Sequence, residues 1–136
     1  MDHQDHQDHQ RIAPRLDAIG RQVVDSAVKV HRFLGPGLLE SAYEHCLAHE
    51  LSVRGLQVVR QVPLPIEYDG LVLDAGYRLD LMVEDNVVVE IKSVESLLRL
   101  HEAQLLTYLK LSRRRLGYLL NFNVTPMRQG IRRMVR

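Results

Sequence analysis

The sequence contains a single cysteine, Cys46, among its 136 residues, and it has no tryptophan. One cysteine excludes an intrachain disulfide, and the lack of disulfides is typical of the reducing cytosol, so we expect a cytoplasmic protein. No apolar run approaches the roughly 20 residues that a membrane-spanning helix needs. The N-terminus also lacks the apolar stretch of a secretion signal. We therefore expect no membrane partner.

The chain also lacks a charge excess of one sign, because 18 Lys and Arg residues stand against 17 Asp and Glu residues. The distribution is less even, since the chain from Lys92 onward has ten basic residues and only two acidic ones. Such asymmetry fits a surface that binds nucleic acid, whose affinity depends mainly on phosphate contacts. A solvated basic surface explains it equally well.

Glycine-rich phosphate loops and dinucleotide-binding fingerprints are absent as well. A length of 136 residues supports one hydrophobic core and one domain. Residues 2–10 repeat Asp-His-Gln three times, a composition that favours a disordered tail. We expect residues 1–16 to form a His-rich tail and linker, and residues 17–136 to form the domain.

Hydrophobic periodicity and turn residues divide the rest of the chain into helices and strands. Pro63 and Pro65 lack backbone donors, so the strand that contains them should lie at a sheet edge. The order ααβββαβ, in which a helix returns the chain to the sheet, predicts a mixed sheet of α/β or α+β type. We expect helices from Asp17 as N-cap to Leu34, at Leu38–Arg54 and at Leu100–Leu111, and strands at Val58–Tyr68, Leu71–Glu84, Val87–Ser93, Leu116–Phe122 and Ile131–Val135, with a turn at Asp69-Gly70.

The segment Arg78–Lys92, RLDLMVEDNVVVEIK, is the most informative part of the chain. Its apolar residues recur at every second position in two runs, as in a hairpin with one face in the core. Asp80, Glu90 and Lys92 share the other face if Asp80 lies opposite Glu90. The residues expected on the core face are Leu79, Leu81, Val83, Val87, Val89 and Ile91.

The register of this hairpin depends on its loop. A two-residue loop at Asp85-Asn86 would place Asp80 opposite Ile91 and separate the two carboxylates. A three-residue loop, 84–86, restores Asp80 opposite Glu90, and its last residue usually takes a left-handed conformation that Asn tolerates. We therefore expect a positive φ at Asn86. Two carboxylates this close would raise one another's pKa unless a divalent cation sits between them.

Asp80 followed by Glu90-x-Lys92 on the next strand resembles the metal-binding core of the PD-(D/E)XK nuclease superfamily. Further along, Gln104-x-x-x-Tyr108 resembles the Q-x-x-x-Y helix element of the exonuclease branch of that superfamily. Upstream, GLLESAY resembles the signature of the GxxExxY family, whose members are assigned to the same fold; it supplies Gly37, Glu40 and Tyr43. The resemblance covers the chain from about Asp17 to the C-terminus.

This resemblance implies a nuclease that hydrolyses phosphodiester bonds with metal-activated water, with Mg²⁺ or Mn²⁺ as cofactor. The carboxylates of Asp80 and Glu90 and the carbonyl of Ile91 would bind the metal. Lys92 would orient the attacking water or stabilise charge on the phosphate. The implied catalytic residues are Glu40, Asp80, Glu90 and Lys92, and the implied substrate-binding residues are Gln104, Tyr108 and His31.

Each of these residues also has a purely structural interpretation. Asp80 and Glu90 could be solvated on an exposed hairpin face, and Lys92 could form a salt bridge with either. Glu40 could complement the helix dipole. Gln104 and Tyr108 could be a helix–sheet contact.

Two functions therefore stay open: a metal-dependent nuclease, and a non-catalytic module that binds nucleic acid or a protein. As partner we expect nucleic acid first, DNA rather than RNA, and as a further expectation self-association as a homodimer.

Overall fold

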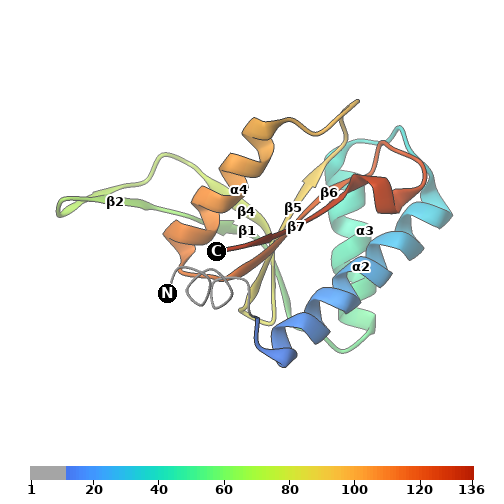
Figure 1. Ribbon diagram of the computed structural model, residues 1–136, viewed down its shortest axis with the longest axis horizontal. Helices are drawn as coiled ribbons and strands as arrows, with labels where there is room; N and C mark the ends of the chain where they lie inside the picture. The colour runs from blue at the N-terminus through green and yellow to red at the C-terminus, as the bar shows by residue number, and fades with distance from the viewer. Residues whose placement is uncertain (1–11) are drawn as a thin grey trace, which may run out of the picture.

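The computed structural model describes residues 12–136 and shows a sheet with helices on both faces (Figure 1). The strand order is β1-β4-β5-β6-β7, and only β5 and β6 are parallel. The predicted mixed sheet is confirmed, and a separate hairpin, β2–β3, is added to it. The elements are α2 (Pro14–Leu34), α3 (Glu40–Val53), β1 (Val58–Pro63), β2 (Ile66–Tyr68), β3 (Leu71–Leu73), β4 (Arg78–Val83), β5 (Val87–Lys92), α4 (Arg99–Ser112), β6 (Leu116–Asn121), the 3₁₀ helix η1 (Met127–Gly130) and β7 (Ile131–Val135).

Helices α2 and α3 pack on one face of the sheet. Val23 and Ala27 of α2 and Leu47 of α3 are fully buried and share a hydrophobic cluster with Val89 and Ile91 of β5. Full burial of a Val, Leu or Ile side chain contributes about 1.5–3 kcal/mol. This first cluster anchors the two helices that precede the sheet in the chain.

Helix α4 covers the opposite face, where Leu105 and Leu109 pack with Val88 and Leu119 in a second cluster. The helix is the crossover that lets β6 run parallel to β5, a connection that antiparallel strands do not need. Strand β5 is therefore buried on both faces, which explains its nearly continuous apolar sequence.

Strand β1 lies at an edge of the sheet, as its prolines predict. The expected continuous strand Val58–Tyr68 is wrong, however, because β1 ends at Pro63 and the chain leaves the sheet before β2. The expected strand Leu71–Glu84 is likewise divided into β3 and β4. The hairpin turn at Asp69-Gly70 is confirmed, since Tyr68 pairs with Leu71 and both loop residues have positive φ.

The loop between β4 and β5 has the predicted three residues, because Val83 pairs with Val87. The expected positive φ at Asn86 is wrong: φ is 53° at both Glu84 and Asp85 instead. The Asn86 amide donates to the carbonyl of Val83 at 3.0 Å and so closes a four-residue turn around Glu84 and Asp85. The Asn86 side chain then donates to the Glu84 carbonyl at 2.8 Å. Asn86 stabilises the turn through its side chain rather than through a left-handed backbone.

The first helix begins at Pro14, three residues before the expected N-cap, Asp17. Proline suits this first position because its missing amide hydrogen would have no partner there. Asp17 lies in the first turn instead and pairs with Arg133 of β7 at 2.8 Å. The predicted tail, residues 1–10, lies outside the described residues. In residues 12–136, no helix combines the length and the hydrophobicity that crossing a bilayer requires.

Candidate active site

Strands β4 and β5 separate at Asp80 and Glu90. The last backbone pair on that side joins Leu81 to Val89. Beyond it, side chains replace backbone partners: the Asp80 amide donates to Oε2 of Glu90, and the Ile91 amide donates to Oδ2 of Asp80, both at 2.8 Å. The two carboxylates therefore meet in the gap between the diverging strands.

This separation changes which face each residue of β4 occupies. Leu81 packs in the first cluster, under α2 and α3, whereas Leu79 packs in the second cluster, beside Met82. The expectation that Leu79 shares a face with Leu81 is wrong, because strict alternation fails at Asp80. Opposite it on β1, Gln61 has a φ of 54°, and the ladder between β1 and β4 skips this pair.

The carbonyl of Ile91 also faces this gap. In a β-strand, the amide and carbonyl of one residue point toward the same neighbour, and the Ile91 amide points at Asp80. Just after the end of β5, the Ser93 amide donates to Oε2 of Glu40 at 3.1 Å. The carboxylates of Asp80, Glu90 and Glu40 thus all accept hydrogen bonds from backbone amides of β4, of β5 or of the residue that follows β5.

Glu40 reaches β5 because the loop between α2 and α3 is fixed. Gly37 has a φ of 99°, a conformation that glycine accepts without strain. The hydroxyl of Tyr43 donates to the Gly35 carbonyl at 2.5 Å and accepts from the Leu38 amide at 3.1 Å. The three signature positions therefore act together: Gly37 turns the chain, the Tyr43 hydroxyl holds the loop, and Glu40 bonds to Ser93 directly after β5.

Ionisation of the Asp80 and Glu90 carboxyls is energetically unfavourable. Glu90 is only 5% exposed, and burial, followed by the charge of Asp80, raises its pKa to about 8. Burial also raises the pKa of Asp80, which the hydrogen bond from the Ile91 amide partly offsets. The charge of Lys92 lowers the pKa of both groups. The site therefore favours a positive charge close to Asp80 and Glu90.

Glu44 is a residue of this region that sequence reasoning missed. It is buried on α3, pairs with Arg60 at 2.7 Å and accepts from the Gln61 side chain at 2.7 Å. Its charge raises the pKa of Asp80 and of Glu90. One signal could have found it: Glu44 lies four residues after Glu40, on the same side of the helix.

Helix α4 adds Gln104 and Tyr108 to the other side of the gap. The charges of Glu90 and Asp80 contribute to a raised pKa of Tyr108, after burial, and a hydrogen bond from Gln104 lowers it. The ring of Tyr108 lies 6.1 Å from that of Tyr77 in an edge-on contact. Tyr77, which follows the β2–β3 hairpin, was also missed, because no sequence pattern connects it with α4.

Comparison with known families agrees with this arrangement. Residues 17–134 match the family model described as PD-(D/E)XK nuclease superfamily. The chain belongs to this superfamily. No curated protein and no solved structure matches the chain.

His31 is placed apart from the superfamily carboxylates. It is buried in the last turn of α2, and its ring lies 6.4 Å from that of Phe122. Its Nε2 has no hydrogen-bond partner, and none of the contacts described in residues 12–136 joins it to Asp80 or Glu90. The structure thus brings together six of the seven predicted catalytic and substrate-binding residues and leaves His31 beside Phe122.

The donor set suits the divalent metal ions that nucleases of this superfamily generally use. Among the described residues, no group of three or more His, Cys, Asp or Glu side chains could hold a metal. Asp80 and Glu90 supply two carboxylates, and Oε1 of Glu90 accepts no hydrogen bond from residues 12–136. Mg²⁺ is commonly held by one or two carboxylates while it keeps several waters, so this small oxygen set fits it.

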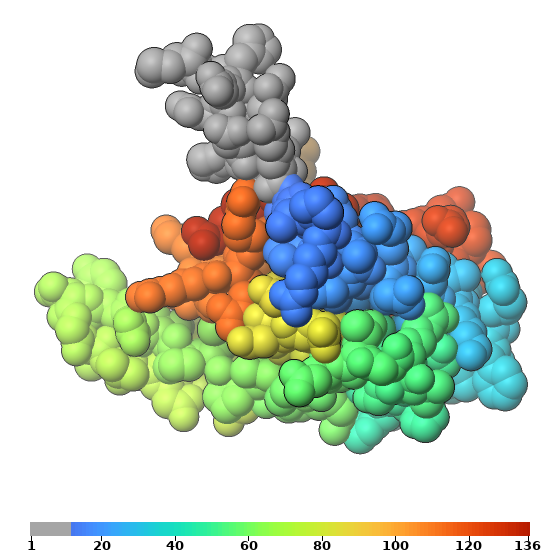
Figure 2. All heavy atoms as spheres, turned by 90° about the horizontal axis from the view of Figure 1, so that it is seen from below, coloured from blue at the N-terminus to red at the C-terminus, as the bar shows by residue number. Residues whose placement is uncertain are grey.

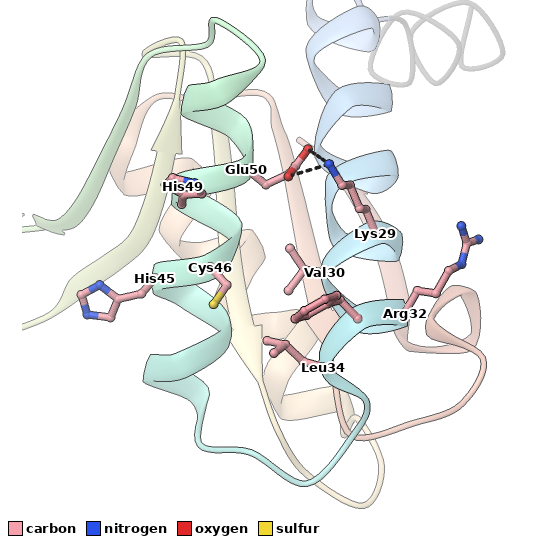
Figure 3. Close-up of a pocket in the computed structure, with 9 residues that line it drawn as sticks. Lys29, Val30, Arg32, Leu34, His45, Cys46, His49 and Glu50 are labelled. Atoms are coloured by element: carbon pink, nitrogen blue, oxygen red, sulfur yellow. Dashed lines mark hydrogen bonds and ion pairs between the residues drawn. The ribbon is translucent and has the colours of Figure 1, made fainter.

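A separate apolar pocket of about 550 Å³ lies between α2 and α3 (Figure 3). Cys46, Val30 and Leu34 line it, together with the ion pair between Lys29 and Glu50. None of the predicted site residues lines this pocket, so its shape gives no information about the role of Asp80 and Glu90.

Proposed function

We propose that the protein is a metal-dependent nuclease that hydrolyses phosphodiester bonds of nucleic acid. The observation that carries this proposal is the convergence of Asp80 and Glu90 where β4 and β5 separate. Strand pairing alone would not require a buried carboxyl and a half-buried one at this point. The superfamily membership agrees with a nuclease type of function. The GLLESAY geometry supports a place in the GxxExxY family.

In this proposal Asp80, Glu90 and the Ile91 carbonyl hold Mg²⁺ or Mn²⁺. A divalent cation bound there would neutralise phosphate charge and lower the pKa of water. Lys92 follows Glu90 by two residues and makes no ion pair within 4 Å in residues 12–136, so its ammonium is available to orient the attacking water or to stabilise the phosphate. Glu40 stands beside this group through its bond to Ser93.

In this proposal Gln104 and Tyr108 bind the substrate beside the carboxylates, and the influence of the Glu90 and Asp80 charges on the pKa of Tyr108 supports this role. For His31, a role toward substrate stays a prediction that its buried position does not support. The basic residues after Lys92 favour a nucleic-acid partner. DNA rather than RNA, and self-association of the chain, are further parts of the proposal.

One observation favours a non-catalytic binding module instead. Both carboxylates accept backbone hydrogen bonds at 2.8 Å, so they also hold the separated strands β4 and β5 together. A module that only binds nucleic acid or a protein would need these hydrogen bonds but no metal.

Conservative substitutions separate the two functions. Asp80→Asn and Glu90→Gln keep an oxygen that can accept the backbone hydrogen bond, but they remove the charge that a metal needs. A nuclease should lose calorimetric Mn²⁺ binding and cleavage in both variants while its melting temperature changes little. The control is Asp74→Asn, whose side chain bonds only to its own turn at Gly76.

Lys92→Ala tests the catalytic part of the proposal, with Lys29→Ala as control, because Lys29 lies on α2, outside the basic segment, and pairs with Glu50. Metal should still bind to the Lys92 variant, whereas cleavage of labelled single- and double-stranded DNA and RNA should fall by at least about 100-fold, the scale of one preorganised donor. If the wild-type protein neither binds Mn²⁺ nor cuts any substrate of the panel, the nuclease proposal fails and the binding module replaces it.

A further inference from the structure

The β2–β3 hairpin projects from one end of the molecule, away from the five-stranded sheet (Figures 1 and 2). It forms its own two-stranded sheet, so the outer edge of each strand has no partner. An isolated two-stranded hairpin is marginally stable in water, and open edges readily pair with another chain. The projecting hairpin therefore has the character of a contact surface.

Apolar side chains are exposed along this hairpin. Tyr68 is 74% exposed, Leu71 58% and Val72 65%. Contiguous exposed apolar residues of this kind mark interaction surfaces in proteins. A solvated loop would carry polar residues here instead.

The charge of the hairpin excludes a phosphate backbone as its partner. Residues 64–77 contain three carboxylates, Glu67, Asp69 and Asp74, and no Lys or Arg. A segment with this charge would repel nucleic acid. The partner of the hairpin should offer an apolar surface with basic residues at its rim.

The chain itself carries such a surface at the root of the hairpin. A pocket of about 670 Å³ lies between β1, the hairpin root and the end of α4. Val62, Leu64 and Met82 contribute to its apolar wall, and Lys110 and Arg113 stand at its basic end. Neither of these two cations makes an ion pair with another residue in 12–136; Glu67 and the Asp85–Arg114 pair also line the pocket.

We propose that two copies of the chain associate by exchanging hairpins. A two-fold axis perpendicular to the hairpins makes them antiparallel, so that the tip of each lies at the root of the other. The tip at Asp69 and Gly70 would then enter the partner's pocket, with Asp69 beside Lys110 and Arg113. Tyr68, Leu71 and Val72 would be covered in the same contact. Apolar and charge complementarity both favour this single arrangement.

Sedimentation velocity at protein concentrations of about 1 to 200 µM tests the association by hairpin exchange, independently of any nuclease activity. The wild-type chain should form a dimer, and Val72→Lys should weaken the dimer by at least about 10-fold, because a buried unpaired charge is unfavourable. The matched control is Val53→Lys at the end of α3, since Val53 is 68% exposed, close to the 65% of Val72. This control should dimerise as the wild type does.

The pocket side is tested by Lys110→Glu combined with Arg113→Glu, which places new carboxylates beside Asp69. This double variant should also weaken the dimer, and adding Asp69→Asn to it should recover part of the loss. A wild-type chain that stays monomeric at 200 µM overturns the proposal. So does a dimer that tolerates Val72→Lys, or one that Val53→Lys weakens equally.

Discussion

At the scale of single residues, Tyr43 combines two roles that different substitutions can separate. Its ring stacks on Phe122 at a centroid distance of 4.5 Å, and its hydroxyl ties the loop between α2 and α3. Tyr43→Phe keeps the stacking but removes both hydrogen bonds and leaves the Leu38 amide unpaired. We expect a loss of about 1–2 kcal/mol in the free energy of unfolding.

Urea unfolding followed by circular dichroism measures this loss. The control is Tyr68→Phe on the exposed hairpin, which should change the free energy of unfolding by less than about 0.5 kcal/mol. If both variants unfold at the same urea concentration, the Tyr43 hydroxyl does not stabilise the loop.

At the scale of elements, Glu50 of α3 links two helices, since it pairs with Lys29 of α2 (Figure 3). It also pairs with Arg54. The hydrogen bond from Arg54, followed by that from Lys29, lowers the pKa of Glu50 below its ordinary value. A lowered carboxyl pKa means that the link stabilises the fold above the unfolded-state pKa and is lost as pH falls through the folded-state pKa. Glu50→Gln should therefore lower the melting temperature at pH 7 and have little effect at pH 3.

The comparison of wild type with Glu50→Gln at both pH values, and in 1 M salt, checks this expectation. Salt should reduce the difference at pH 7, because the pairs lie near the surface. Glu67→Gln, whose carboxylate forms no ion pair in residues 12–136, is the control and should show no such pH dependence. A difference that persists at pH 3 would contradict the role of the Glu50 charge.

Most elements could be predicted from the sequence because their patterns are local. The hairpin register around Asp80 and Glu90 followed from alternation and loop length, and the helix bearing Gln104 and Tyr108 followed from its apolar stripe. The loss of strict alternation that places Leu79 and Leu81 on different faces of β4 could not be predicted in this way. It depends on the Asp80 amide bonding a side chain of another strand, which is a tertiary interaction. Glu44 was missed for the same reason, since its partners lie on β1.

At the scale of the whole molecule, β5 joins the two hydrophobic clusters. Val88 faces α4, whereas Val89 and Ile91 face α2 and α3. The candidate site depends on both layers as well, because Glu40 comes from α3 and Tyr108 from α4. Loss of packing on either face should therefore loosen β5 and, with it, the opposite face.

Leu47→Ala on α3 and Leu109→Ala on α4 test this coupling, because each removes a fully buried side chain from a different cluster. Each should lower the free energy of unfolding by about 2–5 kcal/mol, since the cavity that remains adds to the lost burial. Hydrogen exchange by mass spectrometry should then show faster exchange on both faces in both variants, because the two clusters share one central strand. Leu71→Ala on the exposed hairpin is the control and should leave exchange in α3 and α4 unchanged. If Leu47→Ala accelerates hydrogen exchange in α2 and α3 alone, the two faces of the sheet unfold independently. In that case Asp80 and Glu90 would keep their arrangement when α3 detaches.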